Sequence, residues 1–243
     1  MNANLIEIFS SVQGEGRYVG CRQVFVRFEG CNLCCSYCDT ENQPGMHLLL
    51  QVENHPGSQR FREVMNPVEP FEVSGYINDF LRELPHHSVS LTGGEPLLHT
   101  GFIRELADNV DCPLFLETNG TLPDQLEKVL PYISYISMDI KLPQVTGTDN
   151  WENHKRFLEI ARSKDVYVKL VVSGDIDMKE FQQAVDLVAG IDNSILMVLQ
   201  PVTPMNGVPA ISPDMVLELQ QIALESLKDV RVIPQTHRMM GQL

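Results

Sequence analysis

Short runs of β-branched and aromatic residues alternate six times with longer stretches of helical periodicity, and this pattern constrains the fold of the 243-residue chain more than any other feature. Runs such as VFVRF and VYVKLVVS are typical of strands that are buried on both faces. The stretches between them repeat apolar residues at helical spacing. The predicted strands span residues 24–28, 89–92, 114–118, 135–141, 166–173 and 195–201, and the predicted helices span residues 71–84, 100–109, 123–130, 150–163, 177–188 and 212–226.

Strict alternation of this kind predicts an α/β fold in which parallel strands are joined by right-handed helical crossovers. Six strand and helix units fall short of the eight that close a barrel. Because parallel strands end at the same edge of a sheet, we expect the polar residues at the strand ends to gather on one rim, where barrel active sites lie. These residues are Thr92, Glu117, Asn119, Lys141 and Gln200.

One segment interrupts the alternation. From about residue 45 to residue 70 the chain reads as an apolar strand, a Pro-Gly turn and a more charged strand, which predicts a β-hairpin insertion. The insertion is either a surface excursion without a chemical role or a change to the site itself, since loops tolerate both. We expect residues 1–243 to form a single domain that includes it.

Charge and hydropathy limit what the chain can bind. Thirty-two acidic and eighteen basic residues give a formal net charge of −14, which opposes binding to a phosphate backbone and favours a small-molecule substrate. No run of about 18 apolar residues could span a membrane, and the start MNANLIEIFSS lacks the order of a signal peptide. We therefore expect a cytoplasmic protein without a membrane or nucleic-acid partner.

Four of the six cysteines are crowded into one short segment. Cys31, Cys35 and Cys38 form the pattern C-x-x-x-C-x-x-C. Three thiolates can hold a [4Fe-4S] cluster and leave one iron open to an exogenous molecule. Zinc is a weaker interpretation because zinc sites usually separate their ligand pairs by about a dozen residues, and disulfide frameworks belong to short secreted chains. The remaining cysteines are interpreted as packing residues or bystanders: Cys21, Cys34 and Cys112.

A second motif, TGGEP at residues 92–96, directly follows a predicted strand. Paired glycines let a backbone approach a ligand closely because no Cβ intervenes. In isolation the motif could equally be a plain turn from a strand to a helix. Together with the cysteine pattern it resembles the radical S-adenosylmethionine (SAM) superfamily, and the resemblance extends over nearly the whole chain.

The resemblance implies a partial (β/α)₆ barrel that binds a [4Fe-4S] cluster and SAM. In such enzymes SAM chelates the open iron, and one electron from the cluster splits the sulfonium to give a 5′-deoxyadenosyl radical, which takes a hydrogen atom from the substrate. Gly94 would contact the SAM amino group and Tyr37 would pack beside the adenine. Any one of the strand-end residues could instead be an ordinary solvated side chain. The implied SAM-binding residues are Tyr37, Cys38, Asp39, Gly94, Asn119, Ser137, Met138, Asp139, Lys141, Gln200 and Pro201.

The N-terminal region indicates one family within the superfamily. The segment FSSVQGEGRYVGCRQVFVRFEGCN, the CDT that contains the last cluster cysteine, and QTHR near the end resemble the 7-carboxy-7-deazaguanine synthase family. This resemblance implies ring contraction of 6-carboxy-5,6,7,8-tetrahydropterin to 7-carboxy-7-deazaguanine with loss of ammonia, a step toward deazapurine bases such as queuosine in tRNA. It also implies a homodimer and a flavodoxin- or ferredoxin-type electron donor.

A pterin presents a flat edge of donors and acceptors and a carboxylate. Gln13 and the backbone beside it suit the edge, and the Arg27 guanidinium can donate two parallel hydrogen bonds to the carboxylate. An ion pair from Arg27 to Glu29 or Glu15 is the alternative, and Glu15 could itself hold the pterin amino group. The residues assigned to the substrate are Val12, Gln13, Gly14, Glu15, Arg27, Thr92 and His237.

Two of the implied roles have plainer alternatives. The resemblance makes Thr40 of CDT a ligand of a Mg²⁺ ion that also binds the substrate carboxylate, which agrees with the preference of Mg²⁺ for oxygen ligands and water. Without the resemblance, Thr40 would be interpreted as a helix cap. His237 either helps to close the substrate pocket or is a solvated residue of the C-terminal segment.

Two rival functions share part of this evidence. A radical SAM activating enzyme, which forms a glycyl radical on a partner protein, would carry the same cysteine and GGEP motifs but would not need Gln13, Arg27 and Thr40. A non-catalytic scaffold would bind zinc through the four adjacent cysteines.

Overall fold

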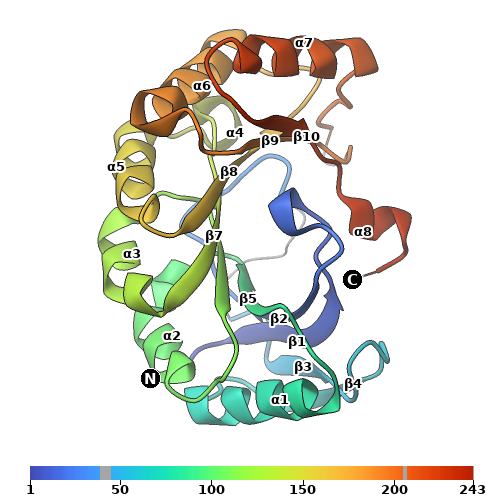
Figure 1. The fold of residues 1–243 in the computed structure, drawn as a ribbon. Helices are drawn as coiled ribbons and strands as arrows, with labels where there is room; N and C mark the ends of the chain where they lie inside the picture. Colours follow the sequence, from blue (N-terminus) through green and yellow to red (C-terminus); the bar gives the residue numbers. More distant parts are fainter. Residues whose placement is uncertain (39–44, 205–206, 243) are drawn as a thin grey trace.

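The computed structural model describes residues 1–38, 45–204 and 207–242. The ten strands found in these ranges form one sheet, in the order β10-β9-β8-β7-β6-β5-β2-β1-β3-β4. The sheet is strongly curved, with the longer helices along its outer side and its inner side open (Figure 1). The two end strands, β10 and β4, do not pair with each other, so the barrel is partial and open, as predicted.

Six parallel strands form the centre of the sheet, and each is followed by a helix on the outer side, which confirms every strand and helix that the periodicity predicts. A short strand, β10 (Val230–Val232), continues the parallel order. The central strands are β2 (Arg22–Phe28), β5 (Ser88–Gly93), β6 (Leu114–Thr118), β7 (Ile133–Asp139), β8 (Asp165–Val172) and β9 (Met197–Pro201). The helices are α1 (Pro70–Glu83), α2 (Thr100–Ala107), α3 (Pro123–Val129), α5 (Trp151–Ala161), α6 (Met178–Asp192) and α7 (Pro213–Leu224). Shorter helical turns are η1 (Gly16–Tyr18), η2 (Pro96–His99), η3 (Leu130–Tyr132), α4 (Pro143–Thr146) and α8 (Thr236–Met239).

Alternate residues of each central strand face two different environments. In β8, Val168 and Leu170 belong to the main hydrophobic core and are fully buried. Tyr167 and Lys169, the residues between and beside them, face the inner side, where Tyr167 joins a second apolar cluster and Lys169 lines a cavity. The outer side therefore supplies the stability of the fold, and the inner side is available for a site.

The turn η1 fills part of the inner side of the sheet (Figure 1). The Tyr18 ring lies 5.1 Å from the Tyr135 ring and 5.7 Å from the Phe115 ring, both in edge contacts. Gly16 has a φ of +65°, and a Cβ at this position would lie 2.1 Å from the Tyr167 hydroxyl. Only glycine fits there, so the turn can seat the residues that precede it against the strands.

The N-terminal strand β1 (Leu5–Val12) runs antiparallel to β2, and the helical and strand periodicity does not predict it. Its sequence, LIEIFSSV, carries polar residues at buried positions. Ser10 is buried because its N–H donates to Glu53 at 2.9 Å and its hydroxyl lies 2.7 Å from the His86 ring nitrogen. These long-range partners satisfy groups that would otherwise oppose burial.

The predicted hairpin insertion is confirmed as β3 (Leu49–Glu53) and β4 (Phe61–Met65). It is not a separate excursion, because β3 pairs with β1 in parallel and extends the main sheet. Two buried carboxylates hold the hairpin in place through hydrogen bonds. Glu53 accepts from the N–H groups of the hairpin loop at Gly57 and Gln59, and Glu29 accepts from the N–H of His47 at 2.8 Å.

In the part of the chain that the structure describes, no helix is both long enough and apolar enough to cross a bilayer.

Candidate active site

A cavity of about 240 Å³ lies on the inner side of the sheet, where the central strands end. It brings together most residues that the sequence assigns to a site. Those that line it are Val12, Gln13, Gly14, Glu15, Arg27, Cys31, Cys35, Tyr37, Cys38, Thr92, Gly94, Asn119, Ser137, Asp139, Lys141, Gln200 and His237.

Four assigned residues are placed differently or not described. The Met138 side chain is fully buried in the core, because residues alternate along β7 and its neighbours Ser137 and Asp139 face the cavity. Its side chain is therefore not available to SAM. Pro201 is half-buried and does not line the cavity. Asp39 and Thr40 lie outside the described residues.

The three thiols of the cysteine pattern face the cavity, whereas Cys34 is exposed and does not line it. The sulfur of Cys31 accepts from the Leu33 N–H at 3.4 Å and from the Asn119 side chain at 3.8 Å. Burial raises the pKa of the Cys35 thiol to about 11. A thiol in this environment loses its proton readily only when a metal cation takes its place, so the donor set fits a metal cluster.

Asn119 holds the cysteine loop against the end of β6. Its amide donates to the Asn32 side chain at 2.9 Å, and its carbonyl oxygen accepts from the Thr121 hydroxyl at 2.6 Å. The Asn32 amide in turn donates to Thr121 at 2.9 Å. The three side chains form a closed set of hydrogen bonds, so Asn119 positions the thiols, in addition to any contact with SAM.

The TGGEP segment packs directly on the loop that leads to the thiols. Gly94 donates from its N–H to the Phe28 carbonyl at 2.9 Å, and a Cβ at Gly94 would lie 1.8 Å from the Gly30 carbonyl oxygen. Because the obstacle is backbone, glycine is required at this position. The motif is therefore a close approach of two backbone segments at the edge of the cavity, which a plain turn would not need.

Glu95 of the same motif is completely buried. Its carboxylate accepts from the N–H groups of Leu97 at 3.0 Å and Asn119 at 2.9 Å, and from the Thr118 hydroxyl at 2.9 Å. Burial raises its pKa to about 7, although these hydrogen bonds act in the opposite direction. Glu95 therefore joins the glycine turn to the end of β6.

Charged groups gather at the ends of β7 and β8. The Lys141 ammonium donates to Asp139 Oδ2 at 2.8 Å and lies 5.1 Å from the centre of the Tyr37 ring. Asp139 Oδ1 and Gln200 Oε1 are buried and have no hydrogen-bond partner among the described residues. An unpaired buried acceptor costs about 1–3 kcal/mol. Both atoms therefore suit donors from a ligand, such as ribose hydroxyls or an amino group.

The assigned substrate residues are already connected to one another. Gln13 donates from its side chain to Gln23 at 3.0 Å and to Glu117 at 3.1 Å, and it accepts from the Glu15 N–H at 3.0 Å. Both amide hydrogens are thus used within the protein. Gln13 positions the loop that follows β1, and its amide hydrogens are not available to the edge of a substrate, which the backbone beside it could contact.

Glu15 carries a firmly held negative charge. It forms an ion pair with Lys169 and accepts from Gln235 at 2.8 Å. Burial raises the pKa of Glu15, but the charge and hydrogen bond of Lys169 and the bond from Gln235 outweigh it and hold the pKa at about 2. The carboxylate is therefore ionised at any pH at which the enzyme would work.

Arg27 pairs with neither Glu15 nor Glu29, the two partners that the sequence suggests. Its Nε donates to Glu7 of β1 at 2.7 Å, and the guanidinium lies 6.0 Å from the centre of the Phe9 ring. The hydrogen bond to Glu7 uses one N–H of the Arg27 guanidinium and orients the remaining N–H groups. About a quarter of the side chain remains exposed, and it faces the cavity.

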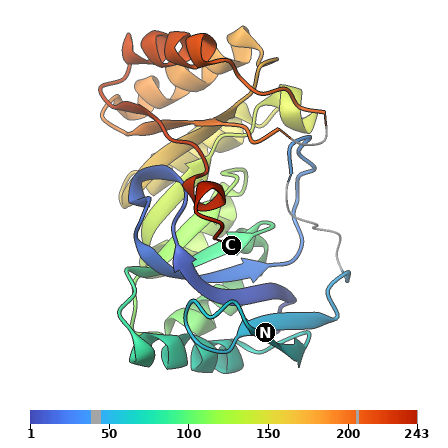
Figure 2. The same cartoon turned by 90° about the vertical axis from the view of Figure 1, so that its right-hand side faces the viewer.

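His237 packs against Gly14, where a Cβ would lie 2.1 Å from the imidazole Nδ1. The preceding Thr236 donates from both its N–H and its hydroxyl to the Gly14 carbonyl, at 2.9 and 3.0 Å. The turn α8 therefore lies in front of the strands on the open side of the sheet (Figure 2). The C-terminal segment forms one wall of the cavity, as predicted for a closing element.

Several residues that line the cavity were not assigned from the sequence. Lys169, Gln235, Phe9 and Phe25 are among them, and Glu117 was expected only at the rim. The Phe9 and Phe25 rings stack with their centres 5.1 Å apart. Lys169 had a detectable signal, because it is the only basic residue inside the otherwise apolar run VYVKLVVS. Gln235 had none beyond its place in QTHR.

Comparison with known proteins agrees with this geometry. Residues 25–188 match the model of the radical SAM superfamily. The 7-carboxy-7-deazaguanine synthase of Geobacter sulfurreducens is 42% identical, over 99% of this chain and 98% of that protein. The enzyme of the same name from Archaeoglobus fulgidus is 36% identical over 99% of both chains. The chain belongs to the 7-carboxy-7-deazaguanine synthase family.

Solved structures support the fold of this family member. The crystal structure of QueE from Escherichia coli matches with a TM-score of 0.60 at 18% identity, over 98% of this chain and 95% of that one. A radical SAM methyltransferase from Sphaerobacter thermophilus matches with a TM-score of 0.63 at 12% identity, over 88% of this chain and 66% of that one. At these identities the likeness concerns the fold alone.

Family membership determines the general chemistry. As a radical SAM enzyme, the protein uses a [4Fe-4S] cluster and SAM, and it acts with a reductant on a small-molecule substrate. The names of the full-length relatives favour a synthase over an activating enzyme of a glycyl-radical protein. Cys34 does not line the cavity that the other three thiols face, which disfavours a zinc site made by all four adjacent cysteines.

Proposed function

We propose that the enzyme converts 6-carboxy-5,6,7,8-tetrahydropterin to 7-carboxy-7-deazaguanine with release of ammonia, in the biosynthesis of 7-deazapurines such as the queuosine precursor. The observation that carries this proposal is that one cavity is lined both by the three thiols and by the segment around Gln13 and Arg27, which carries the resemblance to the synthase family. The relatives that match over nearly the full chain are named for the synthesis of 7-carboxy-7-deazaguanine, which supports the same product.

The cofactors would occupy the side of the cavity formed by β5, β6 and β7. Cys31, Cys35 and Cys38 would bind the [4Fe-4S] cluster, and bound cluster and SAM together would supply the ability to abstract a hydrogen atom from the substrate. Tyr37 and the carbonyl group of Gly94, whose N–H already donates to Phe28, would orient SAM. The unpaired oxygens of Asp139 and Gln200 offer two acceptors to its hydroxyl or amino groups. The further SAM contacts in this proposal are Cys38, Asp39, Asn119, Ser137 and Lys141, with Met138 through its backbone only. Pro201, which does not line the cavity, is left out of the set.

The substrate would lie on the opposite side, against the loop after β1 and the inner face of β1 and β2. Arg27, oriented by Glu7, keeps N–H groups for a carboxylate. Glu15 keeps a permanent negative charge for the donor groups of the pterin edge, together with the backbone from Val12 to Gly14. Thr92 and His237 would form the edges of the substrate pocket. The stacked rings of Phe9 and Phe25 would exclude water from its apolar side.

A Mg²⁺ ion held by Thr40 is part of the proposal, since Thr40 follows the last cluster cysteine in the sequence. Its role would be to orient the substrate carboxylate and to steady negative charge. We further propose a cytoplasmic homodimer that receives electrons from a flavodoxin- or ferredoxin-type donor.

The test is an anaerobic incubation of the reconstituted protein with SAM, a reductant, Mg²⁺ and 6-carboxytetrahydropterin, followed by its ultraviolet spectrum and by mass analysis of the product. We expect the deazaguanine chromophore and one ammonia per product. The Cys35→Ala variant should form neither a cluster nor a product, whereas Thr40→Ala should retain the cluster and respond weakly to added Mg²⁺. An intact cluster that cleaves SAM without forming the deazaguanine would refute the assigned substrate.

A further inference from the structure

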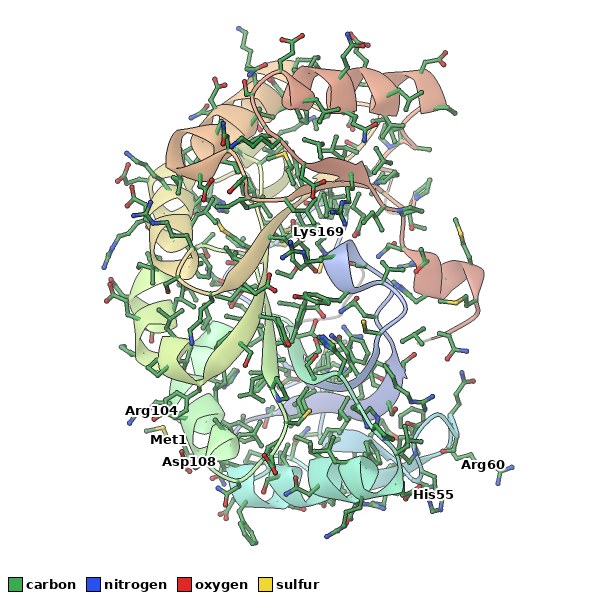
Figure 3. The ribbon with its side chains drawn as sticks, viewed as in Figure 1. Met1, His55, Arg60, Arg104, Asp108 and Lys169 are labelled. Carbon is green, nitrogen blue, oxygen red and sulfur yellow. The ribbon has the colours of Figure 1, made fainter. Side chains whose placement is uncertain are left out.

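Lys169 lies between the two sides of the cavity and belongs to neither set of assigned residues. It comes from β8, and Figure 3 shows it on the inner side of that strand, toward the segment that follows β1. Its ammonium forms an ion pair with Glu15, which is 154 residues away in the sequence, and lies 3.4 Å from Asp139 Oδ2. One ammonium therefore contacts one carboxylate from each side.

The two carboxylates belong to segments that would hold different ligands. Glu15 follows β1 in the loop assigned to the substrate, whereas Asp139 ends β7 in the segment assigned to SAM. No ion pair or hydrogen bond found among the described residues joins Glu15 to Asp139 except through Lys169. The position of one carboxylate thus depends on the other through this single side chain.

The charges around Lys169 are strongly interdependent. Burial lowers the pKa of its ammonium, but Glu15, Asp139 and Glu117 raise it well above its ordinary value. Asp139 shares Oδ2 with Lys141 as well, while its other oxygen is buried without a partner among the described residues. A ligand that donates to this free oxygen would fix the carboxylate and, through Lys169, would fix Glu15 too.

We propose that Lys169 is a positioning residue that couples the SAM side of the cavity to the substrate side, so that binding of either ligand strengthens binding of the other. The proposal rests on the proposed function, because it assigns the two ligands to the two sides. Its physical basis is restriction of motion: the Glu15, Lys169 and Asp139 bridge is already formed, and the first ligand would hold it in one arrangement, so the second ligand would lose less side-chain entropy on binding. Coupling of this kind must be reciprocal.

The test measures SAM binding to the reconstituted enzyme by isothermal titration calorimetry. The cluster is kept oxidised so that SAM is not cleaved, and each titration is run with and without 6-carboxytetrahydropterin. In the unmodified protein we expect the pterin to tighten SAM binding about tenfold, within the usual range for coupled sites. In Lys169→Met we expect the change to fall below about twofold, and in Lys169→Arg, which can still contact two carboxylates, we expect most of it to remain.

Two further variants separate coupling from folding. Lys179→Met makes the same substitution at an exposed lysine of α6 and should keep the full coupling. Lys169→Met leaves the largely buried Glu15 carboxylate without its cation and should lower the melting temperature, so Lys169→Gln serves as a second test that leaves Glu15 unchanged. Lys169→Gln should recover part of the thermal stability without recovering coupling, because its shorter, uncharged side chain can donate to a carboxylate but has no charge to hold both.

The outcomes are distinguishable. Full coupling in Lys169→Met, full coupling in Lys169→Gln, or independent binding of both ligands by the unmodified protein would overturn the role of Lys169 and leave the proposed function intact. Failure of the unmodified protein to bind the pterin would overturn the proposed function and the coupling together.

Discussion

Glu95 of the TGGEP motif allows a quantitative test of whether burial or hydrogen bonding dominates the ionisation of its carboxylate. Two effects oppose each other at its carboxylate: three hydrogen bonds favour the ionised form, and complete burial disfavours it. Burial dominates and raises the pKa from 4.5 to about 7. The substitution Glu95→Gln removes the ionisation while keeping the shape of the side chain.

The expected effect follows from the direction of the shift. Because the pKa in the folded protein lies above that of the unfolded chain, the unfolded chain ionises first as the pH rises. The favourable contribution of Glu95 is fully present below about pH 4.5 and is lost as the pH rises through about 7. The whole loss amounts to about 3 kcal/mol, and about 2 kcal/mol of it falls between about pH 5.5 and pH 8. Glu95→Gln should therefore gain about 2 kcal/mol in stability relative to the unmodified protein over that interval.

The assay is urea unfolding of the metal-free protein at both pH values, followed by circular dichroism. Glu29→Gln is the matched control. Burial raises the pKa of Glu29, but hydrogen bonds from His47, Asn4 and Gly45 lower it to about 2, so its contribution is present throughout this interval. The control is made in a His47→Gln background, because the His47 ring contacts Glu29 and forms an ion pair with it only when protonated. In that background Glu29→Gln should cost the same free energy at both pH values. If Glu95→Gln behaved in the same way, the hydrogen bonds would outweigh burial and the reasoning would be wrong.

Three further predictions concern the cavity. Cys35→Ser should abolish the brown iron–sulfur absorbance, whereas Cys34→Ser should keep it, because Cys35 lines the cavity and Cys34 does not. Gly94→Ala should prevent SAM binding and lower the melting temperature, because its Cβ would collide with the Gly30 carbonyl; calorimetry with normal SAM affinity would contradict this. Arg27→Lys should raise the KM for the pterin about tenfold or more with a smaller effect on kcat, because one of two charged hydrogen bonds is lost; an unchanged KM in steady-state kinetics would exclude the assigned contact.

Much of the architecture follows from local sequence patterns. The six parallel strands and their helices are predicted because apolar periodicity is a property of neighbouring residues. The hairpin is also predicted from local sequence, because a Pro-Gly turn joins an apolar run to a more charged one. The strand β1 is missed because Ser10 and other polar residues occupy buried positions, which only distant partners such as Glu53 make favourable.

The sequence by itself determined the type and order of the central strands, the cysteine loop and the family, because all three depend on short-range spacing. Tertiary structure alone decided the partners of the charged groups. Arg27 of β2 pairs with Glu7 of the neighbouring strand β1, and Glu15 accepts a hydrogen bond from Gln235, which is 220 residues away. The physical reason is that an ion pair depends on which segments the fold brings together, and local periodicity contains no information about segments so far apart in the chain.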